Sequence, residues 1–205
     1  MNSIEAVILD AADPAGAERF YERAFGLGDR VRVRAADEGA GSGFRGYTLS
    51  LVVAQPSIVR GLVGAAVDAG ASEVKPVTKS LWGYGGVVRA PDGALWKVAT
   101  SAKKDTAPDS RTVDEVVLLL GATDVLATKR FYVEQGLTVG KSFGRKYVEF
   151  ATPGSGIKLA LYGRRALAKD AGVPPEGDGP HGLTIAASGT GAFTDPDGFT
   201  WQPAA

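Results

Sequence analysis

The sequence contains no cysteine and only one histidine, His181. The absence of cysteine excludes disulfide bonds, thiolate metal ligands and a cysteine nucleophile, and it agrees with a reducing cytoplasm. With one histidine, any Ser-His-Asp triad would have to use His181, and the sequence has no nucleophile-elbow motif. Basic and acidic residues number 23 each, so no net charge points to nucleic acid or an anionic membrane.

Long hydrophobic runs are also missing. No apolar stretch approaches the roughly 18 residues expected of a membrane-spanning helix. The N-terminal sequence MNSIEAVILD lacks a basic region before an apolar run and so does not resemble a signal peptide. The 205 residues are 44% hydrophobic and 22% charged, which is ordinary for a globular protein. We therefore expect a cytoplasmic protein whose partner is neither nucleic acid nor a membrane.

A segment near the middle of the chain recurs at its end. Residues 89–99 read RAPDGALWKVA, and residues 194–204 read TDPDGFTWQPA. Each Pro-Asp-Gly predicts a tight hairpin turn, because proline fixes φ and glycine tolerates a positive φ. Matching hairpins in the two halves of a chain indicate internal duplication.

Two further pairs of segments keep the same order and spacing. Residues 4–10 (IEAVILD) match residues 113–119 (VDEVVLL). The Phe-Tyr pair at 20–21 matches the Phe-Tyr pair at 131–132, and a Gly-Leu pair follows each shortly afterwards, at 26–27 and 136–137. Each half therefore reads as a strand, a helix, further strands and a closing hairpin.

Local signals divide the chain and place its helices. Asp13-Pro14 and Thr123-Asp124 have the character of helix starts, since Asp caps the first turn and Pro suits the first helical position. A short helix is predicted at residues 164–171. The polar segment SAKKDTAPDSR lacks periodicity, and the predicted division is a first module at 1–102, a linker at 103–111 and a second module at 112–205.

The order of strand, acidic turn, Phe-Tyr helix, Gly-Leu and Pro-Asp-Gly hairpin resembles the vicinal oxygen chelate superfamily. This superfamily includes glyoxalase I, bleomycin-resistance proteins and extradiol dioxygenases. The resemblance implies an α+β fold of tandem βαβββ-type modules, with curved mixed sheets and the helices outside. It also implies a monomer or a homodimer. One such scaffold hosts many reactions, so the resemblance identifies the fold better than the activity.

The resemblance further implies where a divalent metal would bind. In the first half the implied ligand positions fall on Ala6, Lys97 and a position near Thr48, which offer no credible site. In the second half they fall on Glu115, Ala160, His181 and Gln202. Glu115, His181 and Gln202 are therefore the candidate metal ligands, and Glu115 and His181 the candidate catalytic residues. The expected cofactor is either none or one Zn, Ni, Mn or Fe ion.

Simpler interpretations of the same residues stay open. Strand alternation puts Glu115 among apolar side chains, where a carboxylate needs a partner, and Lys97 of the other half is the expected partner. His181 could simply begin a strand after a loop rich in glycine and proline.

Aromatic and basic residues supply candidates for ligand binding. Trp82 and Tyr84 lie in the glycine-rich segment WGYG, predicted to be a flexible loop that folds over a ligand or packs its rings on the sheet edge. The remaining candidates are Lys97, Arg145, Tyr147 and Tyr162.

Three functions follow from these observations. The first is binding of a small organic molecule in the cavity of the curved sheets, with a degenerate metal site. The second is a metal-dependent lyase, isomerase or dioxygenase that uses Glu115 and His181. The third is a structural or interaction protein with a buried pair of Glu115 and Lys97.

Overall fold

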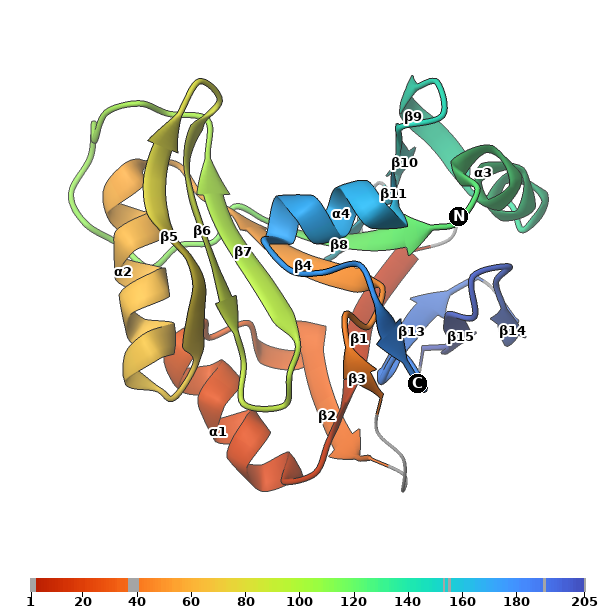
Figure 1. Ribbon diagram of the computed structural model, residues 1–205, viewed down its shortest axis with the longest axis horizontal. Helices are drawn as coiled ribbons and strands as arrows, with labels where there is room; N and C mark the ends of the chain where they lie inside the picture. Colours follow the sequence, from red (N-terminus) through yellow and green to blue (C-terminus); the bar gives the residue numbers. More distant parts are fainter. Residues whose placement is uncertain (1–2, 37–40, 153, 155, 190, 205) are drawn as a thin grey trace.

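The computed structural model describes residues 3–36, 41–152, 154, 156–189 and 191–204. Its elements follow the chain as shown in Figure 1. In order they are β1 (Ser3–Ala11), α1 (Pro14–Ala24), the short 3-10 helix η1 (Gly28–Arg30), β2 (Val31–Ala35), β3 (Ser42–Gly43), β4 (Tyr47–Val52), α2 (Pro56–Asp68), β5 (Ser72–Ser80), β6 (Gly83–Arg89), β7 (Leu95–Thr100), β8 (Glu115–Ala122), α3 (Val125–Glu134), β9 (Thr138–Phe143), β10 (Tyr147–Ala151), β11 (Lys158–Gly163), α4 (Arg164–Ala171), β12 (Gly177–Asp178), β13 (Leu183–Ser188), β14 (Phe193–Thr194) and β15 (Thr200–Pro203).

The larger sheet has eight strands in the order β5-β6-β7-β4-β8-β11-β10-β9. It joins two units of the same type, β4-α2-β5-β6-β7 and β8-α3-β9-β10-β11. In each unit the first strand pairs in parallel with the last, and β4 and β8 meet antiparallel in the middle. This arrangement confirms the predicted α+β class of βαβββ-type modules with curved mixed sheets.

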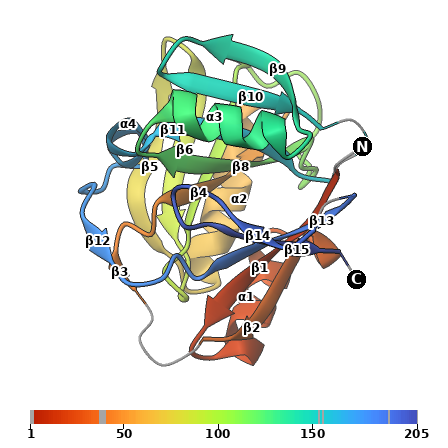
Figure 2. The same ribbon diagram turned by 90° about the vertical axis from the view of Figure 1, so that its right-hand side faces the viewer.

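The smaller sheet has five strands in the order β14-β15-β13-β1-β2. Its middle pair is β1 with β13, antiparallel, and each of these strands pairs in parallel with one further strand, β2 or β15. Each of the two sheets therefore takes strands from both sides of the predicted linker. The short strands β3 and β12 form a separate pair beside them (Figure 2).

The predicted helix starts are confirmed in detail. The side chain of Asp13 accepts a hydrogen bond from the backbone N–H of Gly16, and Pro14 is the first residue of α1. Asp124 caps α3 by accepting from the N–H groups of Leu126 and Ala127. These interactions are local in sequence, which is why the residue types predict them.

One large core cluster contains residues of both sheets and of α1, α2 and α3. Its largest fully buried side chains include Trp96 and Trp201, the equivalent residues of the two recurring hairpins. Each lies against a helical tyrosine, Tyr21 or Tyr132, at ring-centroid distances of 5.4 and 5.5 Å. A second cluster, on the opposite face of the eight-stranded sheet, is built around α4.

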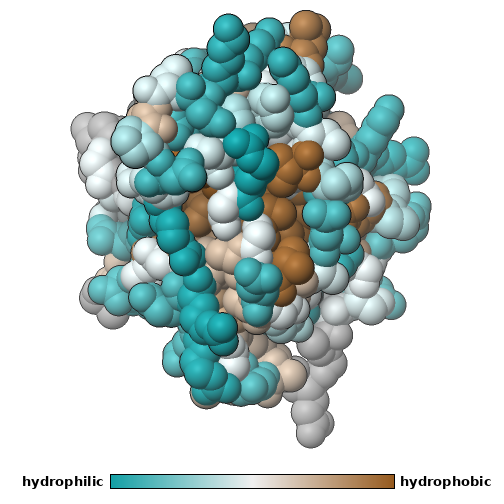
Figure 3. Space-filling model, turned by 90° about the vertical axis from the view of Figure 1, so that its left-hand side faces the viewer, coloured by the Kyte–Doolittle hydropathy of each residue, from teal (hydrophilic) through white to brown (hydrophobic). Residues whose placement is uncertain are grey.

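The predicted linker has no helix or strand but is tied to the helices beside it. Gln55, which is 1% exposed, donates to the carbonyl of Ala107 and accepts from the N–H groups of Thr106 and Ala107. Asp105 accepts from the N–H of Ser57 and so caps α2, because the side chain of the N-cap residue Gln55 makes no capping bond to the helix. The face that carries α2 and this segment is mostly hydrophilic, with hydrophobic side chains gathered near its centre (Figure 3). Within the described residues, no helix has the length and apolar character to cross a membrane.

Candidate functional site

The eight-stranded sheet has an inner face, which we define as the face opposite α2 and α3. A row of neighbouring side chains crosses it from Lys97 of β7 through Ser50 of β4 and Val117 of β8 to Lys158 of β11. Since alternate strand residues share a face, three other positions named by the resemblance also lie here. They are Thr48, Glu115 and Ala160.

Helix α4 covers the middle of this inner face. Its residues Leu167, Ala168 and Ala171 are buried and pack with a cluster that includes Val87, Leu95 and Phe44, whereas Leu119 and Tyr162 lie at its edge. Exposed Arg165 and Lys169 lie on the other side of the helix. At the start of α4, Arg164 donates to the carbonyl oxygen of Phe44 at 2.7 Å. The helix thus occupies the centre of the face where the resemblance implies a metal.

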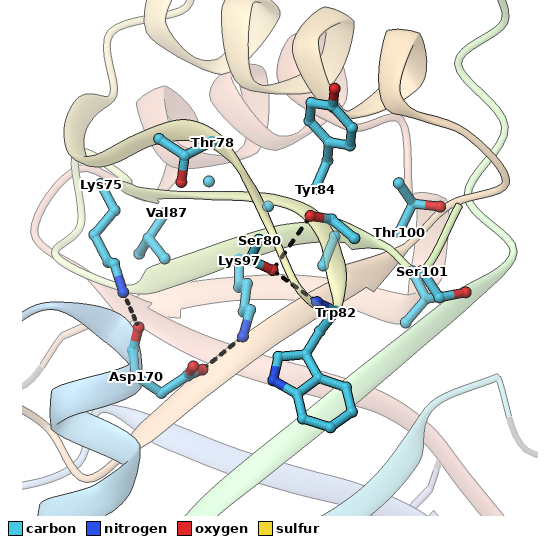
Figure 4. Close-up of a pocket in the computed structure, with 15 residues that line it drawn as sticks. Lys75, Thr78, Ser80, Trp82, Tyr84, Val87, Lys97, Thr100, Ser101 and Asp170 are labelled. Atoms are coloured by element: carbon cyan, nitrogen blue, oxygen red, sulfur yellow. Dashed lines mark hydrogen bonds and ion pairs between the residues drawn. The ribbon is translucent and has the colours of Figure 1, made fainter. Parts of the chain in front are cut away.

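A cavity of about 490 Å³ remains between the C-terminal end of α4 and the strands β5, β6 and β7 (Figure 4). Apolar and glycine residues form much of its lining, including Val52, Gly85, Val87 and Ala99. Hydroxyl groups come from Thr78, Ser80, Thr100 and Ser101. This volume lies within the range of about 300–1,000 Å³ typical of small-molecule sites.

The charged groups of the cavity meet at Asp170 in the last turn of α4. The ammonium of Lys97 lies 2.7 Å from Oδ2 of Asp170, and the ammonium of Lys75 donates to the backbone carbonyl of Asp170 at 2.9 Å (Figure 4). A carboxylate at a helix C-terminus opposes the helix dipole, and the two ammonium groups offset that repulsion.

Three predicted ligand-binding residues, Trp82, Tyr84 and Lys97, line this one cavity. The predicted flexible loop is wrong, because β6 begins at Gly83 and only Leu81 and Trp82 form the turn. Gly83 has φ of +123°, and a side chain there would clash with the backbone of Thr100, so glycine lets the hairpin lie against β7. The Trp82 side chain at this turn is left 84% exposed.

The predicted pair of Glu115 and Lys97 is wrong. Glu115 lies 2.5 Å from the ammonium of Lys158, whereas Lys97 binds Asp170. Strand order explains the difference: β4 separates β7 from β8, while β11 is the direct neighbour of β8. Both residues of the new pair are about 40% exposed, so Glu115 is not a buried charge either.

His181 and Gln202 belong to other parts of the fold than Glu115. The ring nitrogens of His181 face two backbone carbonyl oxygens, that of Arg45 at 2.5 Å and that of Asp197 at 2.9 Å. Its ring also stacks on Phe199 at a centroid distance of 3.9 Å. Gln202 lies on the five-stranded sheet, and Glu115 begins β8 of the other sheet. The geometry therefore gives His181 a role in joining a loop and a turn.

Tyr147 begins β10, Tyr162 lies on β11, and Arg145 lies in the turn before β10. Tyr147 pairs with Tyr162 across β10 and β11, and their rings meet edge to face. Burial, together with the nearby carboxylate of Glu149, raises the pKa of Tyr147 to about 12. Arg145 is exposed in the turn between β9 and β10. None of the three lines the cavity that contains Trp82.

The residues at the implied metal positions do not fit a divalent cation. Lys97 is a cation bound to Asp170, Ala160 has no donor atom, and Glu115 is paired with Lys158. On the other sheet, Gln202 lies in one row with two alanines. Within the ranges that the structure describes, no group of three or more histidine, aspartate or glutamate side chains is placed to hold a metal ion.

Sequence reasoning missed Asp170 and Lys75, which complete the charged part of the cavity. The helix at residues 164–171 was predictable, and so was its apolar side with Leu167 and Ala171. Which sheet face receives that side depends on the path of the chain after β11, and periodicity carries no information about that path.

The structure resembles solved glyoxalase structures over nearly its whole length. Glyoxalase I from Zea mays matches with a TM-score of 0.59 and 12% identity, over 98% of this chain and 91% of that chain. A proposed dioxygenase from Bacillus subtilis matches with a TM-score of 0.57 and 12% identity, over 91% of this chain and 70% of that chain. No protein-family model and no curated protein matches the sequence. The chain therefore has the glyoxalase fold that its hairpins and Phe-Tyr helices predict.

Proposed function

We propose that this protein binds a small organic molecule in the cavity between α4 and the strands β5, β6 and β7, without a metal ion. The observation that carries the proposal is the cavity of about 490 Å³ on the inner face of the sheet. Its lining combines apolar surface with a few polar groups, which is the composition typical of ligand sites. The exposed indole of Trp82 at the edge of the cavity would gain contact area from a bound ligand.

A metal-dependent lyase, isomerase or dioxygenase receives less support. Such an enzyme needs several oxygen or imidazole ligands around one ion. Here both ring nitrogens of His181 face carbonyl oxygens, and Glu115 faces Lys158. Incubation with Zn²⁺, Ni²⁺, Mn²⁺ or Fe²⁺ and then desalting should leave well below one ion per chain. Stoichiometric metal that is lost in Glu115→Ala would favour the enzyme instead.

The binding function is tested by a thermal-shift screen of small aromatic and aliphatic compounds against tag-free protein. A ligand at 100 times its Kd stabilises the folded state by about 2.7 kcal/mol. For a chain of this size, that stabilisation raises Tm by about 5–11 °C.

A cavity-filling variant shows whether a hit binds at this site. In Gly85→Val the new Cβ would lie 3.5 Å from the nearest atom, an ordinary contact, and the added methyl groups would fill the cavity. Ala99→Leu fills the same space from the neighbouring strand, should Gly85→Val fold poorly. The matched control is Gly61→Val on α2, where nothing lies within 4 Å. Compounds that still raise the Tm of both cavity variants would bind elsewhere on the protein, and this result would refute the proposal.

A further inference from the structure

The cavity has an excess of positive charge. Its charged lining residues, within the part of the chain that the structure describes, are Lys75, Lys97 and Asp170. The cavity thus holds two ammonium groups and one carboxylate: Lys97 pairs with the carboxylate of Asp170, and Lys75 donates to the backbone carbonyl of the same residue. A site with this balance favours a ligand that carries one negative charge.

The carboxylate of Asp170 is accessible to solvent. Its side chain is 41% exposed and that of Lys97 is 32% exposed, so solvent reaches the ion pair. An ion pair with this exposure is weak, because water screens it and both side chains lose rotational freedom. A carboxylate from a ligand can therefore take the place of Asp170 at Lys97.

The surface next to the two lysines suits a planar ring. Gly85 and Ala99 are direct neighbours on β6 and β7, and they leave a flat area with hardly any side chain. Figure 4 shows the Trp82 side chain pointing to the same side of the cavity as the ends of Lys97 and Asp170, while the Tyr84 ring points the opposite way. An aromatic ring on the flat area could stack against the indole of Trp82, which is otherwise 84% exposed.

We propose that the ligand of this cavity is an aromatic monocarboxylate, whose carboxylate binds Lys97 and Lys75 in place of Asp170 and whose ring packs against Trp82. This inference rests on the proposed binding function and specifies the chemical class of the ligand. Asp170 acts as an internal competitor, because its carboxylate occupies Lys97 in the absence of the ligand.

The test uses three probes with the same ring: 2-naphthoate, neutral 2-naphthamide and cationic 2-naphthylmethylammonium. Isothermal titration at pH 7 gives each Kd for the full chain. We expect naphthoate to bind about tenfold more tightly than naphthamide, since charge-assisted hydrogen bonds are the stronger ones. The ammonium probe should bind most weakly, and added salt should reduce the preference for naphthoate.

Substitutions show which residues produce the preference for naphthoate over naphthamide. Lys97→Met should weaken naphthoate about tenfold and leave naphthamide within about twofold, whereas Trp82→Ala should weaken both probes alike. Asp170→Asn removes the competitor and should strengthen naphthoate about threefold or more. Lys169→Met is the matched control, since it removes one lysine charge from the exposed side of the same helix and should change neither Kd.

The outcomes separate this inference from the proposed function. Equal binding of naphthoate and naphthamide, lost in Gly85→Val, would refute the anionic class and leave small-molecule binding intact. Weaker naphthoate binding in Asp170→Asn would also refute the inference, because Asp170 would then be part of the binding surface. Binding of no naphthyl probe at millimolar concentration would refute it as well, and the broad thermal-shift screen would then decide the proposed function alone.

Discussion

Replacement of Leu167 by alanine tests whether α4 belongs to the inner face of the eight-stranded sheet. Leu167 is fully buried and packs with Phe44, Val87 and Leu95, none of which lies on its own helix. If α4 were only loosely attached, these contacts would contribute little to stability. If α4 is part of the packed structure, the variant leaves a cavity beside the strands.

The size of the effect follows from what is removed. Leu→Ala changes at fully buried sites cost about 2–5 kcal/mol, from the lost transfer free energy and the cavity that remains. The opposite side of α4 faces solvent, with Arg165 and Lys169 exposed, so the helix can partly collapse into the space. We therefore expect the lower part of the range, about 2–3 kcal/mol, and a fall in Tm of about 4–12 °C.

Urea unfolding followed by far-UV circular dichroism measures this free energy, and the m value shows whether the variant keeps the same compactness. Arg165→Ala on the exposed side of α4 is the control and should lie within about 0.5 kcal/mol of the wild type. A loss below about 0.5 kcal/mol for Leu167→Ala would refute the placement of α4 against the sheet. The proposed cavity would then lose the wall that contains Asp170.

Three further changes probe other parts of the structure. Gln55→Ala removes the hydrogen bonds that tie residues 103–111 to α2, so trypsin should cleave within that segment at least several times faster; unchanged cleavage would show that other contacts hold it. Tyr132→Phe removes the 2.6 Å bond to buried Asp195 and should cost about 1–3 kcal/mol by urea unfolding, whereas a cost near zero would show that the bond adds nothing net. Asp124→Ala removes the carboxylate that caps α3. The backbone N–H groups of Ala127 and Leu126 donate to this carboxylate and hold the pKa of Asp124 below its usual value. The carboxylate therefore stabilises the folded state at pH values above its unfolded pKa, near 4, and this contribution is lost as the pH falls through the lower folded pKa. The difference in Tm between wild type and variant should then narrow below about pH 4. A difference in Tm that stays constant with pH would contradict a lowered pKa for Asp124.

Features that depend on neighbouring residues were predictable from the sequence. Asp13 with Pro14, and Asp124, start helices because the capping carboxylate and the N–H groups it accepts from lie within three residues. The glycines of the two Pro-Asp-Gly turns adopt φ of +91° and +93°, as the turn type requires. The fold class followed as well, because these local signals recur in the same order in both halves of the chain.

Features that depend on strand order were not predictable. The partner of Glu115 is Lys158, 43 residues away, because β11 and not β7 is the neighbour of β8. The hydrogen bonds between Gln55 and residues 106–107 have no sequence motif that predicts them, because a buried side-chain amide can bond to any backbone that lies near it. The same limit applies to Asp170, whose role depends on where α4 comes to lie.

The charges of the inner face suggest how this fold could keep a preference for anionic ligands without a metal. The resemblance implies a divalent cation at this face, and a cation there attracts ligand oxygens. In this chain the implied last-strand ligand position is Lys97, which pairs with the Asp170 carboxylate, and Lys75 of the edge strand donates to the backbone carbonyl of the same residue. The two ammonium groups carry together the charge of one divalent ion, but each moves on a flexible side chain and neither activates water as a Lewis acid does. The proposed role of the two lysines is therefore to bind the anionic group of a ligand by charge-assisted hydrogen bonds.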